Sequence, residues 1–166
     1  QQIVEAMGVV KALRDMGYLK FDEPFKSLVH QGVILGPDGM RMSKSKGNVI
    51  YADELAARFG IDAVRYYLLS EIPFTQDGTI TYESFITKFN ADLANTLGNL
   101  VNRTVAMTNK YFGGKVTAPT TCEELDNELI AVTRETIEKY YSLMDAYRNA
   151  DACECVMNFA KRLNKY

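Results

Sequence analysis

The stretch GTITYESFITKFNADLANTLGNLVNRTVAMTNKYFGG, residues 78–114, decides the fold. Apolar side chains recur in it at steps of three and four residues, which is the spacing of one helix face: Phe85, Phe89, Leu93, Leu97, Leu100, Val101 and Val105. The pattern predicts one long helix from Glu83 to about Tyr111, with a bend at Gly98. Gly113 and Gly114 break the pattern and end the helix.

Two further amphipathic patterns follow this helix. They are CEELDNELIAVTRETIEKYYSLMDAY (122–147) and ADACECVMNFAKRLNKY (150–166), and KVTAPTTC (115–122) links the first of them to the long helix. Three helices with short connections favour an antiparallel bundle.

The chain before residue 82 is broken into shorter elements. EAMGVVKALRDMGY (5–18) reads as a helix that has Val9, Leu13 and Met16 on one side and ends at Gly17. GVILG (32–36) is a short apolar run between glycines, which indicates a strand, and PDGM (37–40) after it indicates a turn. A loop at residues 39–49 therefore follows a hairpin.

YADELAARFGIDAVRYYLLSE (51–71) predicts two helices. The first is capped near Asp53 and stops at Gly60, and the second starts after Asp62 and has Val64, Tyr67 and Leu68 on one face. A short strand at 79–81 is placed to pair with residues 33–35. The prediction is a mainly α protein, in which a small α/β unit of strand, helix, helix and strand precedes the antiparallel helical bundle.

Composition limits the classes of function. The 166 residues are 47% hydrophobic and 24% charged, as in a soluble globular protein, and the net charge is −2. A net charge near zero gives no global attraction to nucleic acid, so a polyanion must be met by a local cluster of cations. No apolar run approaches the length that spans a bilayer, and we expect a cytoplasmic protein without a membrane partner.

The cysteines and the single histidine give no metal or disulfide pattern. Cys122, Cys153 and Cys155 are odd in number and lack a paired CxxC spacing, and His30 has no second histidine beside it. We therefore expect no metal site, no zinc ligands and reduced, buried thiols.

The sequence GMRMSKSKGNV, residues 39–49 and called the basic loop below, concentrates positive charge. Arg41, Lys44 and Lys46 stand beside Ser43 and Ser45, with almost nothing apolar to bury. A solvated turn explains the serines and glycines, whereas the clustered charge predicts an anionic partner.

These residues carry a resemblance to a known family. RMSKSKGN resembles the KMSKS loop of class I aminoacyl-tRNA synthetases, with Arg41 in place of the usual first lysine. The segment from about Ser43 to Tyr166, and FGIDAV to KYFGG (59–114) above all, is similar to bacterial methionyl-tRNA synthetase. Residues 1–38, with YLKFDEPFKSLVHQGVILGPDG (18–39), look more like leucyl-tRNA synthetase.

The resemblance implies that the basic loop closes over ATP, which arrives with magnesium. Lys44 is then the principal catalytic residue and Arg41 assists it, because cations offset the charge that builds on the departing pyrophosphate. The ATP-binding residues carried over from the family are Arg41, Met42, Ser43, Lys44 and Ser45.

The resemblance also implies a site for tRNA with a methionine anticodon. Asn99 and Arg103 lie four residues apart, on one helix face, and match the family's anticodon-binding residues. Unpaired bases offer edges for such hydrogen bonds. The alternative for this pair is a helix contact and a surface charge.

The implied organisation is that of a fragment. Residues 1–82 form the end of the catalytic region with the basic loop and a stem-contact unit, and 83–166 form an anticodon-binding domain truncated at its C-terminus. The HIGH element and the catalytic core that carries it do not occur in the sequence, so we expect a fragment of methionine–tRNA ligase that is inactive alone. The alternatives are a leucine, isoleucine or valine enzyme, or a non-catalytic tRNA-binding module.

Overall fold

The computed structural model describes residues 2–116 and 118–166, and the chain divides into two units, Gln1–His30 and Gln31–Tyr166. The first unit contains α1 (Gln2–Asp15), which Gly17 ends at a φ of 82°, as the sequence predicts. The amide of Tyr18 closes the end of the helix by donating to the carbonyl of Leu13. No described residue of α1 is buried, and the predicted apolar side is exposed at Val9 and Met16.

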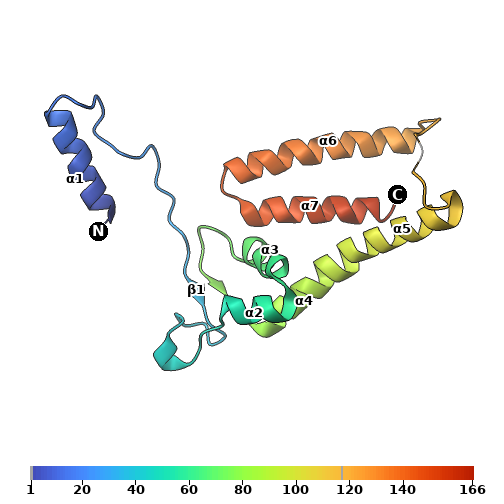
Figure 1. Cartoon of the computed structure of the whole chain (residues 1–166), viewed down its shortest axis with the longest axis horizontal. Coiled ribbons are helices and arrows are strands. Elements are labelled where there is room, and N and C mark those ends of the chain that lie inside the picture. Colours follow the sequence, from blue (N-terminus) through green and yellow to red (C-terminus); the bar gives the residue numbers. More distant parts are fainter. Residues whose placement is uncertain (1, 117) are drawn as a thin grey trace. The chain divides into compact units, whose positions relative to one another are not determined.

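The second unit begins with a minimal sheet. Strand β1 (Ile34–Leu35) pairs with β2 (Gly78–Thr79) in parallel, Ile34 opposite Gly78 and Leu35 opposite Thr79. The predicted strand pairing is confirmed. The connection between the two strands carries α2 (Ala52–Phe59) and α3 (Ile61–Glu71), as shown in Figure 1.

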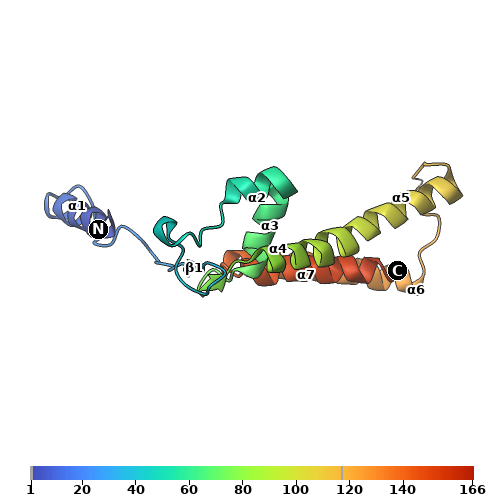
Figure 2. The ribbon, with the colours of Figure 1, turned by 90° about the horizontal axis from the view of Figure 1, so that it is seen from below.

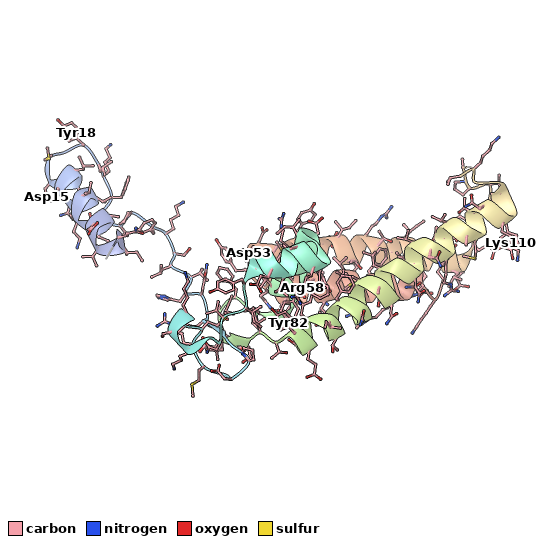
Figure 3. The ribbon with its side chains drawn as sticks, turned by 60° about the horizontal axis from the view of Figure 1, so that its bottom comes forward. Asp15, Tyr18, Asp53, Arg58, Tyr82 and Lys110 are labelled. Atoms are coloured by element: carbon pink, nitrogen blue, oxygen red, sulfur yellow. The ribbon has the colours of Figure 1, made fainter. Side chains whose placement is uncertain are left out.

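The ends of α2 and α3 differ in detail from the prediction. Asp53 is not the N-cap of α2, because Tyr51 takes that position without a side-chain cap, and Asp53 lies in the first turn (Figure 3). There its carboxylate is favoured by the partial positive charge of the helix N-terminus. Gly60 separates the helices at a φ of 87°, and α3 starts at Ile61, before Asp62.

The predicted long helix forms, but it changes its winding. It runs through α4 (Tyr82–Lys88), the π-helical segment η2 (Phe89–Gly98) and α5 (Asn99–Phe112), and Gly113 ends it at a φ of 59°. The residue at which the sequence predicts a bend, Gly98, is the last residue of η2. A π-helix is rare and often marks a functional position.

The core of this unit lies where α2, α3 and α4 meet. Phe85 is fully buried, and its ring lies 4.8 Å from that of Phe59 and 5.0 Å from that of Tyr67. Leu55, Val64 and Ile80 complete the buried cluster around it, which confirms the predicted inward face of α3.

The bundle is completed by α6 (Glu124–Asp145) and α7 (Asn149–Leu163), which run antiparallel side by side (Figure 1). Helix α7 also packs against α3 and η2. Helix α5 extends beyond the end of α7 in both views (Figures 1 and 2), and none of its residues is buried. The mainly α architecture with an antiparallel helical pair is therefore confirmed.

Among the described helices, none combines the length and the apolar character needed to cross a bilayer.

Candidate functional site

The basic loop leaves the sheet through a tight turn. The amide of Gly36 donates to the carbonyl of Met40 at 2.8 Å, and Leu35 forms an antiparallel bridge with Arg41. Gly39 has a φ of 70°, a backbone conformation that would be strained in a residue with a side chain. The predicted hairpin turn is present, and the loop stands out beside β1 (Figure 1).

The centre of the loop is a single 3₁₀ turn, η1 (Lys44–Lys46). The amide of Lys46 donates to the carbonyl of Ser43 at 3.0 Å, and Gly47 closes the turn at a φ of 67°. The hydroxyls of Ser43 and Ser45 lie 2.8 Å apart and bond to each other. The turn therefore projects Lys44 from a defined backbone.

The side chains predicted to bind ATP are available on this turn. Arg41, Lys44 and Ser45 are exposed, while Met42 and Ser43 are half-buried. Within the described residues, neither Arg41 nor Lys44 lies within ion-pair distance of a carboxylate. Their charge is thus not paired with a carboxylate in the part of the chain that the structure describes.

Asn48 ties the two ends of the loop together, a role that the sequence reasoning missed. Its side-chain oxygen accepts from the amide of Ser43 at 2.8 Å, and its side-chain nitrogen lies 3.0 Å from each carboxylate oxygen of Asp38. The amide of Met40 also donates to Asp38, and this bond, followed by that from Asn48, holds the pKa of Asp38 below its ordinary value of 3.8. The Pro-Asp-Gly sequence is typical of a turn in which the Asp38 carboxylate accepts a backbone hydrogen bond. No sequence pattern indicates that Asp38 also bonds to Asn48.

The second predicted pair lies at the start of α5. Asn99 and Arg103 are both exposed, one turn apart on this helix. The guanidinium of Arg103 donates to the backbone carbonyl of Asn164 at 3.4 Å. The structure therefore leaves both side chains accessible and connects Arg103 to the end of α7.

A partly buried polar cluster joins α3 to the long helix. The ammonium of Lys88 lies 3.0 Å from both Glu71 and Asp92, and the hydroxyl of Tyr66 donates to Asp92 at 2.7 Å. Burial alone raises the pKa of Asp92, but the bonds from Tyr66 and Lys88 outweigh it and leave the pKa below its ordinary value. Burial and the Asp92 carboxylate both raise the pKa of Tyr66.

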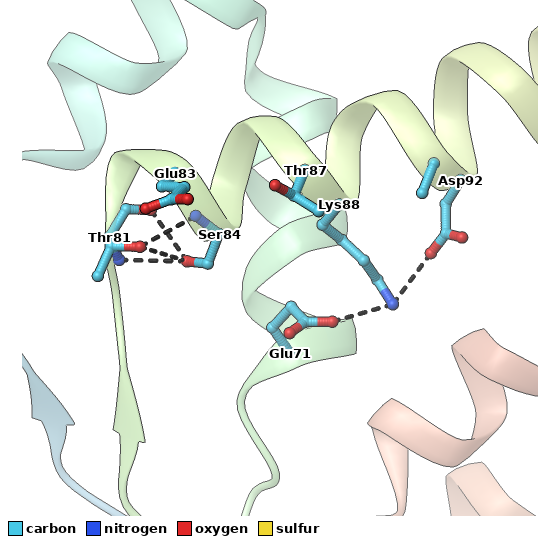
Figure 4. A pocket seen from close by; sticks show the side chains of 8 residues that line it. Glu71, Thr81, Glu83, Ser84, Thr87, Lys88 and Asp92 are labelled. Atoms are coloured by element: carbon cyan, nitrogen blue, oxygen red, sulfur yellow. Dashed lines mark hydrogen bonds and ion pairs between the residues drawn. The ribbon is translucent and has the colours of Figure 1, made fainter.

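This cluster borders an open depression of about 480 Å³. Figure 4 shows Lys88 reaching from the long helix to Glu71 on one side and Asp92 on the other, with the Thr81 and Ser84 helix cap at the far end. Lys88 pairs there with Glu71 and Asp92, Thr81 bonds to Ser84, and the depression contains no residue of the basic loop. The cluster is explained as the joint between α3 and η2.

The described residues contain no group of three or more His, Cys, Asp or Glu side chains that could hold a metal ion. The three cysteines are free thiols. The predicted burial is wrong for Cys122, which is exposed in the linker, whereas burial raises the pKa of Cys153.

The family model described as class I tRNA synthetases (M) matches residues 17–105, more than half of the 166-residue chain. The chain belongs to the class I tRNA synthetases. The match includes the basic loop and ends just after Arg103.

Curated proteins similar to this chain include methionine–tRNA ligases. The ligase of Clostridium perfringens is 52% identical over 129 residues, which are 78% of this chain and 20% of the relative. The ligase of Lactococcus lactis is 48% identical over 141 residues, which are 85% of this chain and 21% of the relative. This synthetase chain therefore spans about a fifth of the length of these relatives.

Solved synthetases share the fold. Mycobacterium tuberculosis methionyl-tRNA synthetase in complex with methionyl-adenylate has a TM-score of 0.74 and 38% identity, over 80% of this chain and 26% of that one. A LeuRS of Agrobacterium radiobacter K84, in a ternary complex with tRNA and LeuAMS, has a TM-score of 0.81 at 24% identity, over 98% of this chain and 20% of that one. At this identity the leucyl enzyme shows the fold alone.

Replacing Asn48 by alanine is expected to loosen the basic loop of this synthetase. The amide of Ser43 then loses its acceptor, and its protection against hydrogen exchange falls by about fivefold, the effect of one hydrogen bond. Asn90→Ala, at an exposed position in η2, is the matched control and leaves Ser43 protected. Unchanged protection of Ser43 in Asn48→Ala contradicts the role given to Asn48.

Acid is expected to loosen the same loop. The pKa of Asp38 is lowered by folding, so its bonds contribute fully above 3.8, the ordinary pKa, and are lost as the pH falls through the lowered value. Protection of the Met40 amide, corrected for the intrinsic exchange rate at each pH, should therefore decrease only below about pH 4. In Asp38→Asn, protection of the Met40 amide should no longer change with pH in this range. If protection of the Met40 amide in the unchanged chain already falls near neutral pH, the role given to Asp38 is contradicted.

Proposed function

We propose that this chain is the part of a methionine–tRNA ligase that carries the KMSKS loop and the anticodon-binding bundle. The observation that carries the proposal is the basic loop, with Arg41 and Lys44 exposed and free of carboxylates among the described residues, within a chain that matches methionine–tRNA ligases over most of its length. Residues 1–82 then belong to the catalytic region and its stem-contact unit, and 83–166 to the anticodon-binding domain. The ligase acts in the cytoplasm.

The proposed role of the basic loop is to bind the triphosphate of ATP as methionyl-adenylate forms. Lys44, on the 3₁₀ turn, approaches the departing pyrophosphate and stabilises its charge most strongly in the transition state. Arg41 assists from the strand side, while Met42, Ser43 and Ser45 shape the contact. Magnesium accompanies ATP as part of the substrate, and the cationic side chains of Arg41 and Lys44 are donors suited to phosphate oxygens rather than to a cation.

The proposed role of α5 is to recognise the anticodon of the methionine tRNA. Asn99 offers an amide that both donates and accepts, and Arg103 offers a planar array of donors, the two chemistries that read exposed base edges. Both lie exposed in the first turns of a helix that extends beyond α7 (Figure 2). The tRNA is therefore met by a helix face and a local charge, without a globally positive protein.

The test is binding of the 166-residue chain to two RNA stem-loops at fixed moderate salt, one with the anticodon CAU and one with the leucine anticodon GAG. We expect a preference for CAU, and Arg103→Ala should weaken CAU binding by about tenfold or more, as for the loss of a hydrogen bond to a charged group. Arg134→Ala, an exposed arginine on α6, is the matched control for charge. Equal binding of both stem-loops by the folded chain overturns the anticodon role.

A further inference from the structure

We propose that Asn164 is a positioning residue for the recognition pair on α5, acting on both Asn99 and Arg103 from the end of α7. The inference rests on the proposed anticodon function of that pair. Asn164 lies 61 residues from Arg103 in the sequence, and the fold brings the two together.

The first link runs through η2 to Asn99. The side-chain nitrogen of Asn164 donates to the backbone carbonyl of Thr96 at 3.0 Å. The same carbonyl accepts the amide of Asn99, the first residue of α5. Asn164 therefore bonds to the atom that anchors Asn99 at the junction where the π-helical winding ends.

Thr96 is a rigid point for this link. It is buried, and its hydroxyl donates to the carbonyl of Ala91 at 2.9 Å, five residues back along η2. A wider winding directs carbonyls away from their ordinary helical partners, and an added donor satisfies such a group. The side-chain amide of Asn164 supplies that donor, and this bond fixes the start of α5 relative to α7.

The second link is direct. The guanidinium of Arg103 donates to the backbone carbonyl of Asn164 at 3.4 Å, and within the described residues no carboxylate lies within ion-pair distance of Arg103. This bond links the long side chain to the residue that follows α7. The backbone amide of Asn164 donates to the carbonyl of Ala160 at 3.0 Å, so the backbone of Asn164 continues the last turn of α7.

These two links give pre-organisation. An unrestrained arginine loses rotamer freedom when it binds RNA, and this loss weakens binding. A guanidinium already held beside Asn99 loses less, while its remaining donors stay free for a base edge. The expected consequence is that Asn164 affects the affinity for the CAU anticodon and not the general attraction to RNA phosphates.

The experiment compares Asn164→Ala and Asn164→Leu in the full 166-residue chain, the second keeping the side-chain volume without its hydrogen bond. Each should weaken CAU stem-loop binding by about fivefold, the usual effect of one hydrogen bond, and leave GAG stem-loop binding unchanged. Asn158→Ala, an exposed asparagine on the same helix, should change neither. A measurement without RNA accompanies it: the Asn99 amide should exchange faster in both Asn164 variants than in Asn158→Ala.

The outcomes separate this inference from the proposed function. If the unchanged chain prefers CAU and both Asn164 variants bind like Asn158→Ala, the positioning role is overturned while the anticodon role stands. Equal weakening for both stem-loops also overturns it, because a general loss of structure explains that result. If the unchanged chain shows no CAU preference, the anticodon role fails and the positioning role fails with it.

Discussion

If this chain is part of a methionine–tRNA ligase, as proposed, replacing Lys44 by alanine in that ligase is expected to slow methionyl-adenylate formation by about 100-fold to 1,000-fold, the effect of removing one group that stabilises transition-state charge. The structure supports a large effect, because Lys44 is exposed on a 3₁₀ turn and pairs with no carboxylate among the described residues. Removing the Lys44 side chain therefore removes an interaction with the substrate and changes the free energy of unfolding little. The measurement is ATP–pyrophosphate exchange dependent on methionine.

The kinetic form of the loss distinguishes catalysis from simple ATP binding. An interaction made only in the transition state lowers kcat with little change in KM, whereas equal binding of ATP and the transition state raises KM alone. Lys139→Ala, an exposed lysine on α6, is the control for loss of a positive charge and leaves the exchange rate unchanged. Adenylate formation at the original rate by folded Lys44→Ala enzyme rules out the catalytic role.

For the long helix, the sequence predicts the extent of the helix but not its winding. The steps of three and four residues predicted its extent, and Gly113 ends it where expected. The same steps do not reveal the π-helical winding of η2, because apolar spacing tolerates a slow change of helical phase. The segment η2 also contacts α3 and α7, and local spacing does not encode contacts of this kind.

The same division holds for the candidate site. The positive charge and the glycines of the basic loop could be predicted because the residues lie close together in sequence. The shared helix face of Asn99 and Arg103 could be predicted for the same reason. The closure of the loop by Asn48 and Asp38 depends on two side-chain bonds across ten residues. The contact of Asn164 with Thr96 spans 68 residues and exists only in the folded chain. Pairwise polar contacts of this kind leave no periodic signal.

Replacing Phe85 by alanine is expected to lower the free energy of unfolding by about 3 to 5 kcal/mol, the range for truncating a buried phenylalanine. Phe85 is fully buried and packs against Phe59, Tyr67 and Phe89, from α2, α3 and η2. Truncation removes apolar burial and leaves a cavity where the three elements meet. Urea unfolding followed by circular dichroism measures the change.

The neighbouring residue supplies the matched control. Ile86 is 44% exposed, so Ile86→Ala should cost no more than about 1 kcal/mol. Should Phe85→Ala fail to fold, Phe85→Leu keeps most of the volume and still costs a measurable amount, about 1.5 kcal/mol. Equal losses for the Phe85 and Ile86 variants contradict the placement of the core. Because α3 also packs against α7, Phe85→Leu is expected to reduce hydrogen-exchange protection in α7 as well.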